Sequence, residues 1–239
     1  MDIILAEEIV FSYLFLRLPL VLLFSLATLG LQVVRSRLYG YRFYRPFLLN
    51  IVLAWIPIGL SVVAHILFLR NNYQITPAVW LILAVWFFFF PNAIYLITEV
   101  HHFRDESKVP LWFDTIALLS IVLNGVLLGS YSLMIIHFLL RTQLSGGQSW
   151  LVLVGYVLLA NFGIFIGRYL RFNSWDVVRN PLGLLRSILA QLRTREQLRN
   201  LFLYMLLFSF FILVFYLFIE LDFQNLYGLG AALKLLRGS

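Results

Sequence analysis

Most of the side chains that could do chemistry lie in two stretches of the 239-residue chain, Trp86–Asp114 and Gly163–Pro181. The rest of the chain is strongly apolar, and ionisable groups at membrane depth are costly enough to need a structural or functional reason. The residues that we select as a candidate site are Asn92, Glu99, His101, His102, Asp114, Arg168, Arg171, Asn173 and Asp176.

The first stretch predicts a polar stripe on one face of a helix. Pro91 should kink or end its helix, because proline lacks a backbone donor. If the helix continues, polar residues fall at i, i+3, i+7 and i+10 and share one face. These residues are Asn92, Tyr95, Glu99 and His102. Asp114 follows one turn inside the next apolar segment.

We expect the candidate residues to converge at one membrane surface, where two interpretations stay open. In a polar clasp, opposite charges pair and lock the third, fourth and fifth spans together. In a ligand-binding or catalytic pocket, Arg168 and Arg171 bind an anionic group such as a lipid head group or a small phosphate compound. Asn92 and Glu99 would then orient this group or handle a proton.

A direct ion pair is expected under both interpretations. Arginine stays charged, and its planar fork suits a carboxylate. We therefore predict that at least one acidic side chain of the cluster pairs with Arg168 or Arg171. The acidic side chains concerned are Glu99, Asp114 and Asp176.

The histidines raise the question of a metal or haem. His101 and His102 would point about 100° apart on a helix, so one ion would not easily take both, and we predict no metal. His65 and His137 lie at similar depth near the outer ends of two spans, as bis-histidine haem ligation needs. Two unrelated interfacial histidines are the simpler interpretation, so we predict no cofactor.

The composition identifies the environment of the chain. Hydrophobic residues make up 62% and charged residues 12%, and the mean hydropathy is +0.92. A soluble enzyme, a disordered protein and a collagen-like fibre are excluded. With no cysteine, disulfides, zinc fingers and thiol nucleophiles are excluded as well.

Six apolar segments are long enough to cross a bilayer. They cover about residues 9–34, 47–69, 78–97, 111–140, 150–167 and 201–219. We predict an all-α polytopic membrane helix bundle that forms a single integral membrane domain over residues 1–239. The first span contains Arg17 and Pro19, and whether residues 1–16 belong to it stays open.

The net charge of +7 is distributed unevenly between the two sides of the predicted membrane. Thirteen basic residues follow spans one, three and five, and four lie on the opposite side. Basic residues favour the cytoplasmic side. We therefore predict a multi-pass protein of a bacterial inner membrane with both termini outside the cytoplasm.

Leu182–Arg199 predicts a cytoplasmic amphipathic helix after the fifth span. Its leucines keep helical spacing, and its basic residues lie off that stripe. We expect contact with anionic lipids and no nucleic acid. The basic residues concerned are Arg186, Arg193, Arg195 and Arg199.

Two G-x-x-x-G pairs predict close helix packing. They are Gly125–Gly129 in the fourth span and Gly163–Gly167 in the fifth. We expect these two spans to pack on each other, with Asn124 and Asn161 as interhelical hydrogen-bonding groups.

In its two polar stretches the chain resembles a family of bacterial multi-pass membrane proteins known only as a domain of unknown function. Members carry a sequence motif similar to F-P-N-A-x-Y-x-x-T-[DE]-x-x-H, which corresponds to Phe90–His102 in this chain. A second motif similar to V-P-x-W-x-D follows and corresponds to Val109–Asp114. A third motif, similar to G-R-[FY]-L-R-x-N-S-W-D, corresponds to Gly167–Asp176 in this chain. The resemblance implies a multi-pass membrane protein and carries over no activity.

We therefore expect an integral membrane protein that binds or moves a small anionic ligand or a lipid head group at a polar cytoplasmic pocket. Two alternatives stay open. One is a membrane-embedded enzyme with Glu99 or Asp114 as base beside a histidine. The other is an assembly or structural subunit of a membrane complex.

Overall fold

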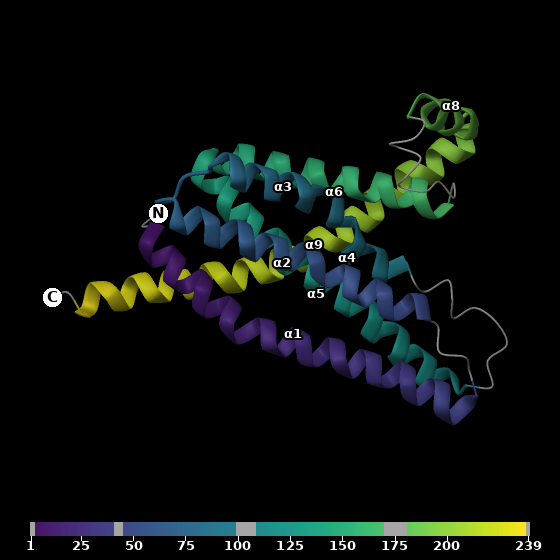
Figure 1. Ribbon diagram of the computed structural model, residues 1–239, viewed down its shortest axis with the longest axis horizontal. Helices are drawn as coiled ribbons and strands as arrows, with labels where there is room; N and C mark the ends of the chain where they lie inside the picture. Colours follow the sequence, from purple (N-terminus) through teal and green to yellow (C-terminus); the bar gives the residue numbers. More distant parts are fainter. Residues whose placement is uncertain (1–2, 41–44, 99–108, 170–180, 238–239) are drawn as a thin grey trace. The chain divides into compact units, whose positions relative to one another are not determined.

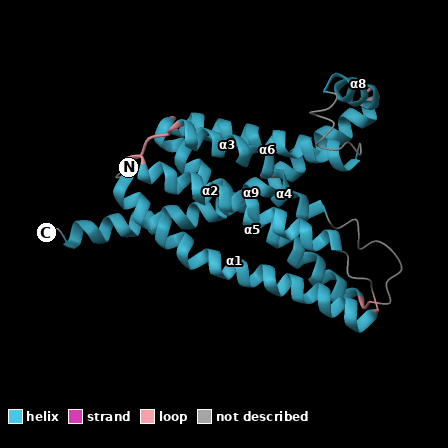
Figure 2. Ribbon diagram, in the orientation of Figure 1, coloured by secondary structure: helices cyan, strands magenta, loops and turns pink. Residues whose placement is uncertain are grey.

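The computed structural model describes residues 3–40, 45–98, 109–169 and 181–237, and within them the chain is helical apart from short turns (Figures 1 and 2). No strand occurs in these described ranges, which confirms the all-α prediction. The helices are α1 (Ile3–Tyr39), α2 (Arg45–Arg70), α3 (Pro77–Phe89), α4 (Pro91–Tyr95), α5 (Leu111–Gln143), α6 (Gly146–Tyr169), α8 (Pro181–Gln191) and α9 (Arg195–Arg237).

The described helices include six segments long and apolar enough to cross a membrane, which confirms the polytopic helical fold. They are Leu16–Tyr39, Leu48–Arg70, Pro77–Thr98, Leu111–Gln143, Gly146–Arg168 and Arg195–Asn225. The first apolar segment belongs to one continuous helix that begins at Ile3 and contains Pro19. The described residues before Leu16 therefore extend this helix.

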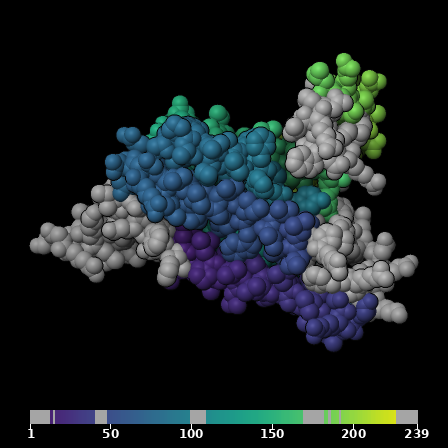
Figure 3. All heavy atoms as spheres, in the orientation of Figure 1, coloured from purple at the N-terminus to yellow at the C-terminus, as the bar shows by residue number. Residues whose placement is uncertain are grey.

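The chain divides into two compact units. Unit 1 comprises residues 1–139 and 215–239, and unit 2 comprises residues 140–214. Within unit 1, α2 packs on α3 and α4. In Figure 3 the coloured atoms of α1, in purple, lie against those of α2, in blue, and Trp55 of α2 contacts Ser25 of α1. Leu128–Leu139 of α5 is an unbroken buried run, so this part of α5 lies in the core of unit 1.

The third apolar segment breaks at proline, as the sequence predicts. α3 ends at Phe89 and α4 begins at Pro91, with Phe90 between them in helical geometry. The Phe90 N–H still donates to the Trp86 carbonyl at 2.8 Å, so the helical hydrogen-bond pattern continues up to the residue before Pro91. A short 3₁₀ turn then carries the chain from Leu96 to Thr98.

The glycines of α5 face α4, and the prediction that they pack against the glycines of the fifth span is wrong. A Cβ added at Gly125 would lie 2.6 Å from the Ala93 carbonyl oxygen, and one at Gly129 would lie 3.8 Å from the Ala93 Cβ. A Cβ added at Gly163 would meet nothing within 4 Å among the described residues. A G-x-x-x-G pair indicates that a helix needs a close neighbour without saying which helix that is.

Two helix starts carry reciprocal caps. At the start of α9, the Gln197 N–H donates to Thr194 Oγ1 at 3.2 Å and the Thr194 N–H donates to Gln197 Oε1 at 3.3 Å. Ser145 and Gln148 form the same capping box before α6. The cap at Thr194 corrects the single amphipathic helix predicted over Leu182–Arg199. The segment is split, and Arg199 belongs to the helix of the sixth span.

Replacing Gly125 with alanine should destabilise unit 1 by about 1–3 kcal/mol, because the new methyl group overlaps the Ala93 carbonyl. The matched control is Gly59→Ala in α2, where an added Cβ meets nothing within 4 Å. That variant should be neutral or more stable by up to about 1 kcal/mol. Reversible unfolding in mixed detergent micelles would measure both, and equal effects would contradict the close approach of α5 and α4.

Candidate functional site

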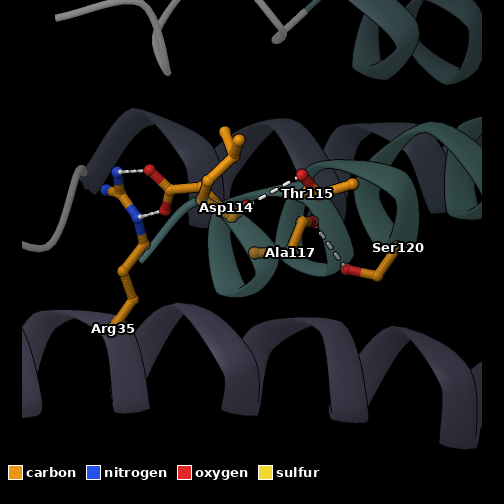
Figure 4. A network of polar contacts seen from close by, with 6 residues as sticks. Arg35, Asp114, Thr115, Ala117 and Ser120 are labelled. Carbon is orange, nitrogen blue, oxygen red and sulfur yellow. Dashed lines mark hydrogen bonds and ion pairs between the residues drawn. The ribbon is translucent and has the colours of Figure 1, made fainter. Parts of the chain in front are cut away.

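A buried ion pair joins the end of α1 to the start of α5 (Figure 4). Arg35 Nε donates to Asp114 Oδ1 at 2.7 Å, and Arg35 Nη2 donates to Asp114 Oδ2 at 3.2 Å. Arg35 is 7% exposed and Asp114 is 9% exposed. The pair is bidentate, which is the strongest geometry that a guanidinium and a carboxylate can adopt. Asp114 also lies in the first turn of α5, where the helix dipole favours an anion.

Arg35 is a partner of Asp114 that the sequence analysis does not single out. The expected pairing of an acidic side chain with Arg168 or Arg171 stays a prediction, because Arg171 lies outside the described residues. Arg35 lies one turn before the end of α1, and Asp114 lies one turn after the start of α5. Spans that alternate in direction bring these two positions to the same membrane depth. The position of Arg35 near the end of its span therefore indicates that it can reach Asp114. Arg35 also counts among the basic residues that orient the protein in the membrane.

Few of the other predicted site residues are described. Asn92 on α4 is half-buried, and so is Arg168 near the end of α6 in unit 2. The predicted convergence of the whole cluster therefore stays a prediction. The candidate residues that lie outside the described ranges are Glu99, His101, His102, Arg171, Asn173 and Asp176.

A second polar group lies near the middle of the spans of unit 1. Ser25 Oγ on α1 lies 2.9 Å from Asn124 Oδ1 on α5, and Asn124 Nδ2 lies 3.4 Å from Thr28 Oγ1. The indole of Trp55 on α2 donates to Ser25 Oγ at 3.1 Å. Ser25, Thr28 and Asn124 are buried. Asn124 is thus an interhelical hydrogen-bonding group, as predicted, and it ties α5 to α1.

The histidines considered for haem have different neighbours. His137 Nδ1 lies 2.5 Å from the Tyr216 hydroxyl, and the ring of His65 packs edge-on against Phe138 with centroids 5.6 Å apart. Both histidines are buried. Among the described residues, no group of three or more histidine, aspartate and glutamate side chains could hold a metal ion.

The described part of unit 2 contains a buried polar contact between α6 and α9, and it carries a basic surface. Asn161 Nδ2 on α6 donates to Ser209 Oγ on α9 at 2.9 Å, which again fits the predicted role of the asparagine. The basic surface, which we call the arginine segment, combines four exposed arginines with three exposed leucines. The arginines are Arg186, Arg193, Arg195 and Arg199, and the leucines are Leu182, Leu189 and Leu198.

Comparison with known proteins identifies a family. The family model described as "Protein of unknown function (DUF1361)" matches residues 49–215. No curated protein and no solved structure matches the chain. The matched residues include Asp114, whereas its partner Arg35 precedes them.

The buried pair leads to a test by double-mutant cycle. Arg35→Gln leaves the Asp114 carboxylate without its counter-charge and should cost about 3–5 kcal/mol of unfolding free energy. Adding Asp114→Asn should recover part of that loss, because the uncompensated charge is then gone. Unfolding in mixed micelles gives the four free energies that the cycle needs.

The chain supplies a matched control for this cycle. Arg17 Nη2 lies 3.0 Å from Asp222 Oδ2, but these two side chains are 40% and 49% exposed. Arg17→Gln should cost less than about 1 kcal/mol, because water screens an exposed pair. Equal losses for Arg35→Gln and Arg17→Gln would show that burial does not strengthen the Arg35–Asp114 pair.

Proposed function

Because the chain belongs to the DUF1361 family of proteins of unknown function, we propose a function from its own geometry. The protein is an integral membrane protein that binds the head groups of anionic lipids at its cytoplasmic surface. The arginine segment of α8 and the start of α9 is the binding surface.

The observation that carries this proposal is the unbalanced exposed charge of the arginine segment. Four exposed arginines lie between residues 181 and 199, and Glu196 is the one acidic residue in that range. The guanidinium fork binds phosphate oxygens in a bidentate manner. Each basic side chain near an anionic membrane surface contributes about 1 kcal/mol of attraction. The exposed leucines would enter the apolar edge of the bilayer beside these head groups.

The ion pair of Asp114 supports placing the ligand surface on α8 instead of at the start of α5. A carboxylate held by two hydrogen bonds from Arg35 has its charge compensated, as in the clasp interpretation. An enzyme that used Asp114 as a general base would first have to break this pair. The clasp and the lipid surface are therefore separate features in our proposal.

The proposal includes the orientation derived from the basic residues. The arginine segment faces the cytoplasm of a bacterial cell, where anionic lipids create a negative surface potential. Both termini and the turn at Ser145–Gly147 face the opposite side. The membrane in this proposal is the bacterial inner membrane. The orientation is inferred from the distribution of arginine and lysine along the chain.

The lipid proposal is tested by the effect of lipids on the unfolding temperature. Phosphatidylglycerol added to the protein in micelles should raise its unfolding midpoint by about 5 °C near saturation, because a ligand stabilises the state that binds it. Phosphatidylcholine should have little effect. A variant with glutamine at positions 186, 193, 195 and 199 should lose the response to phosphatidylglycerol.

Two control variants sharpen this test. Lysine at the same four positions keeps the charge and should retain a partial response, since lysine binds phosphate as a point charge. Arg70→Gln removes an exposed arginine at the end of α2 and should respond like the natural chain. An undiminished response of the four-glutamine variant would refute the proposed surface.

The orientation is tested by cysteine labelling in intact cells. The chain contains no cysteine, so Gly147→Cys and Arg193→Cys each introduce a single, exposed thiol. An impermeant maleimide should label position 147 in intact cells and position 193 only after lysis. The reverse pattern would invert the proposed topology and move the arginine segment to the outer surface.

A further inference from the structure

A buried chain of ionisable side chains lies near the end of α5 opposite Asp114. His137 Nδ1 on α5 lies 2.5 Å from the hydroxyl oxygen of Tyr216 on α9, and this hydroxyl lies 2.9 Å from Glu220 Oε2. His137 and Tyr216 are fully buried, and Glu220 is 5% exposed. All three residues belong to unit 1. We call them the His–Tyr–Glu chain.

The His–Tyr–Glu chain lies within two apolar segments. His137 is in the segment Leu111–Gln143, and Tyr216 and Glu220 are in the segment Arg195–Asn225. Ionisable side chains inside such segments are rare and typically mark proton or ion pathways. Gln224 Nε2 donates to Glu220 Oε1 at 2.8 Å, and Gln224 is half-buried. The second carboxyl oxygen of Glu220 therefore contacts a polar side chain that reaches the surface of the described chain.

The hydroxyl of Tyr216 has one proton and lies within hydrogen-bond distance of both His137 and Glu220, which permits two arrangements along this chain. In the first, His137 Nδ1–H donates to the Tyr216 oxygen, and the Tyr216 O–H donates to the Glu220 carboxylate. In the second, the Glu220 carboxyl O–H donates to the Tyr216 oxygen, and the Tyr216 O–H donates to His137 Nδ1. Starting from imidazolium and carboxylate, the His137 N–H bond and the Tyr216 O–H bond break, and new O–H bonds form at Tyr216 and at Glu220. The products are neutral imidazole and neutral carboxylic acid, with the proton count unchanged.

Other ionisable groups of this region have contacts of their own. The Tyr13 hydroxyl donates to Asp222 Oδ2 at 2.9 Å, and Arg17 pairs with the same oxygen. His65 on α2 packs on Phe138, and α3 contains no ionisable residue. In this half of unit 1, the other titratable or charged side chains that the structure describes include Tyr13, Arg17, His65, Arg70, Tyr131 and Asp222.

From this geometry we propose that His137, Tyr216 and Glu220 form a binding site for one proton within the membrane-spanning part of the protein. The bound proton moves between His137 Nδ1 and Glu220 Oε2 through the hydroxyl of Tyr216. The site is independent of the lipid surface, because it uses none of the arginines of that surface. It gives the protein a proton as a second ligand.

Infrared difference spectra recorded across a pH titration test the proposal. The sample is the full chain, labelled with ¹⁵N-histidine, in phosphatidylcholine liposomes. Glu220→Gln identifies the carboxyl band of Glu220, and His137→Gln identifies the ring bands of His137. In the natural chain both signals should titrate with one common midpoint, because coupled groups share their macroscopic steps.

The decisive variant is Tyr216→Phe, which keeps the ring and removes the hydroxyl that links the two groups. The carboxyl and histidine signals should then separate by about one pH unit or more, since a hydrogen bond to a charged group is lost. Separate midpoints in the natural chain, or a common midpoint that survives in Tyr216→Phe, would overturn the proposal. Asp222→Asn on the same helix should leave the common midpoint intact, and a separation there would also overturn it.

If Tyr216→Phe does not fold, the proposal can be tested with Glu220→Gln by following the titration of the His137 signal. Glutamine keeps the size of the side chain and cannot accept the shared proton. The His137 signal should then titrate at a midpoint displaced by about one pH unit from that of the natural chain. An unchanged His137 midpoint would show that His137 and Glu220 do not share a proton.

Discussion

The fold of unit 1 depends on the need to satisfy polar groups where water is absent. Hydrocarbon offers no hydrogen-bond partner, so a polar side chain within a span must find one on a neighbouring helix. α5 contains such groups near its start, middle and end, at Asp114, Asn124 and His137. Their partners lie on α1 and α9. The deeply buried position of α5 follows, because only a central helix can reach partners on several sides.

The sequence is sufficient to predict the helices but not their neighbours. Hydropathy and length identify six spans, and Pro91 identifies the break in the third, because both depend on local chemistry. The need of Asp114 for an arginine at its own depth is also predictable. That Arg35 is such a partner is not predictable in the same way, because span direction fixes depth and leaves lateral position open. Gly125 shows the same limit, since its missing side chain indicates a close contact without naming α4.

The spacing of residues at the helix ends contains further local signals. Thr194 and Gln197 have the spacing of a capping box, and this spacing indicates that a helix, α9, begins there. Tyr216 and Glu220 are four residues apart on an apolar helix, so they share one face. The contact of Tyr216 with His137, 79 residues earlier, depends on tertiary packing that sequence spacing does not encode.

The separation of Arg35 and Asp114 along the chain gives the order in which their charges reach the membrane. Arg35 is translated 79 residues before Asp114, which at usual rates of synthesis is about 4–16 s. During that interval the long side chain of Arg35 can keep its charge at the interface. When the α5 segment enters the membrane, its carboxylate meets a guanidinium that is already in place. A chain shortened to residues 49–215 would insert the same acid without this counter-charge.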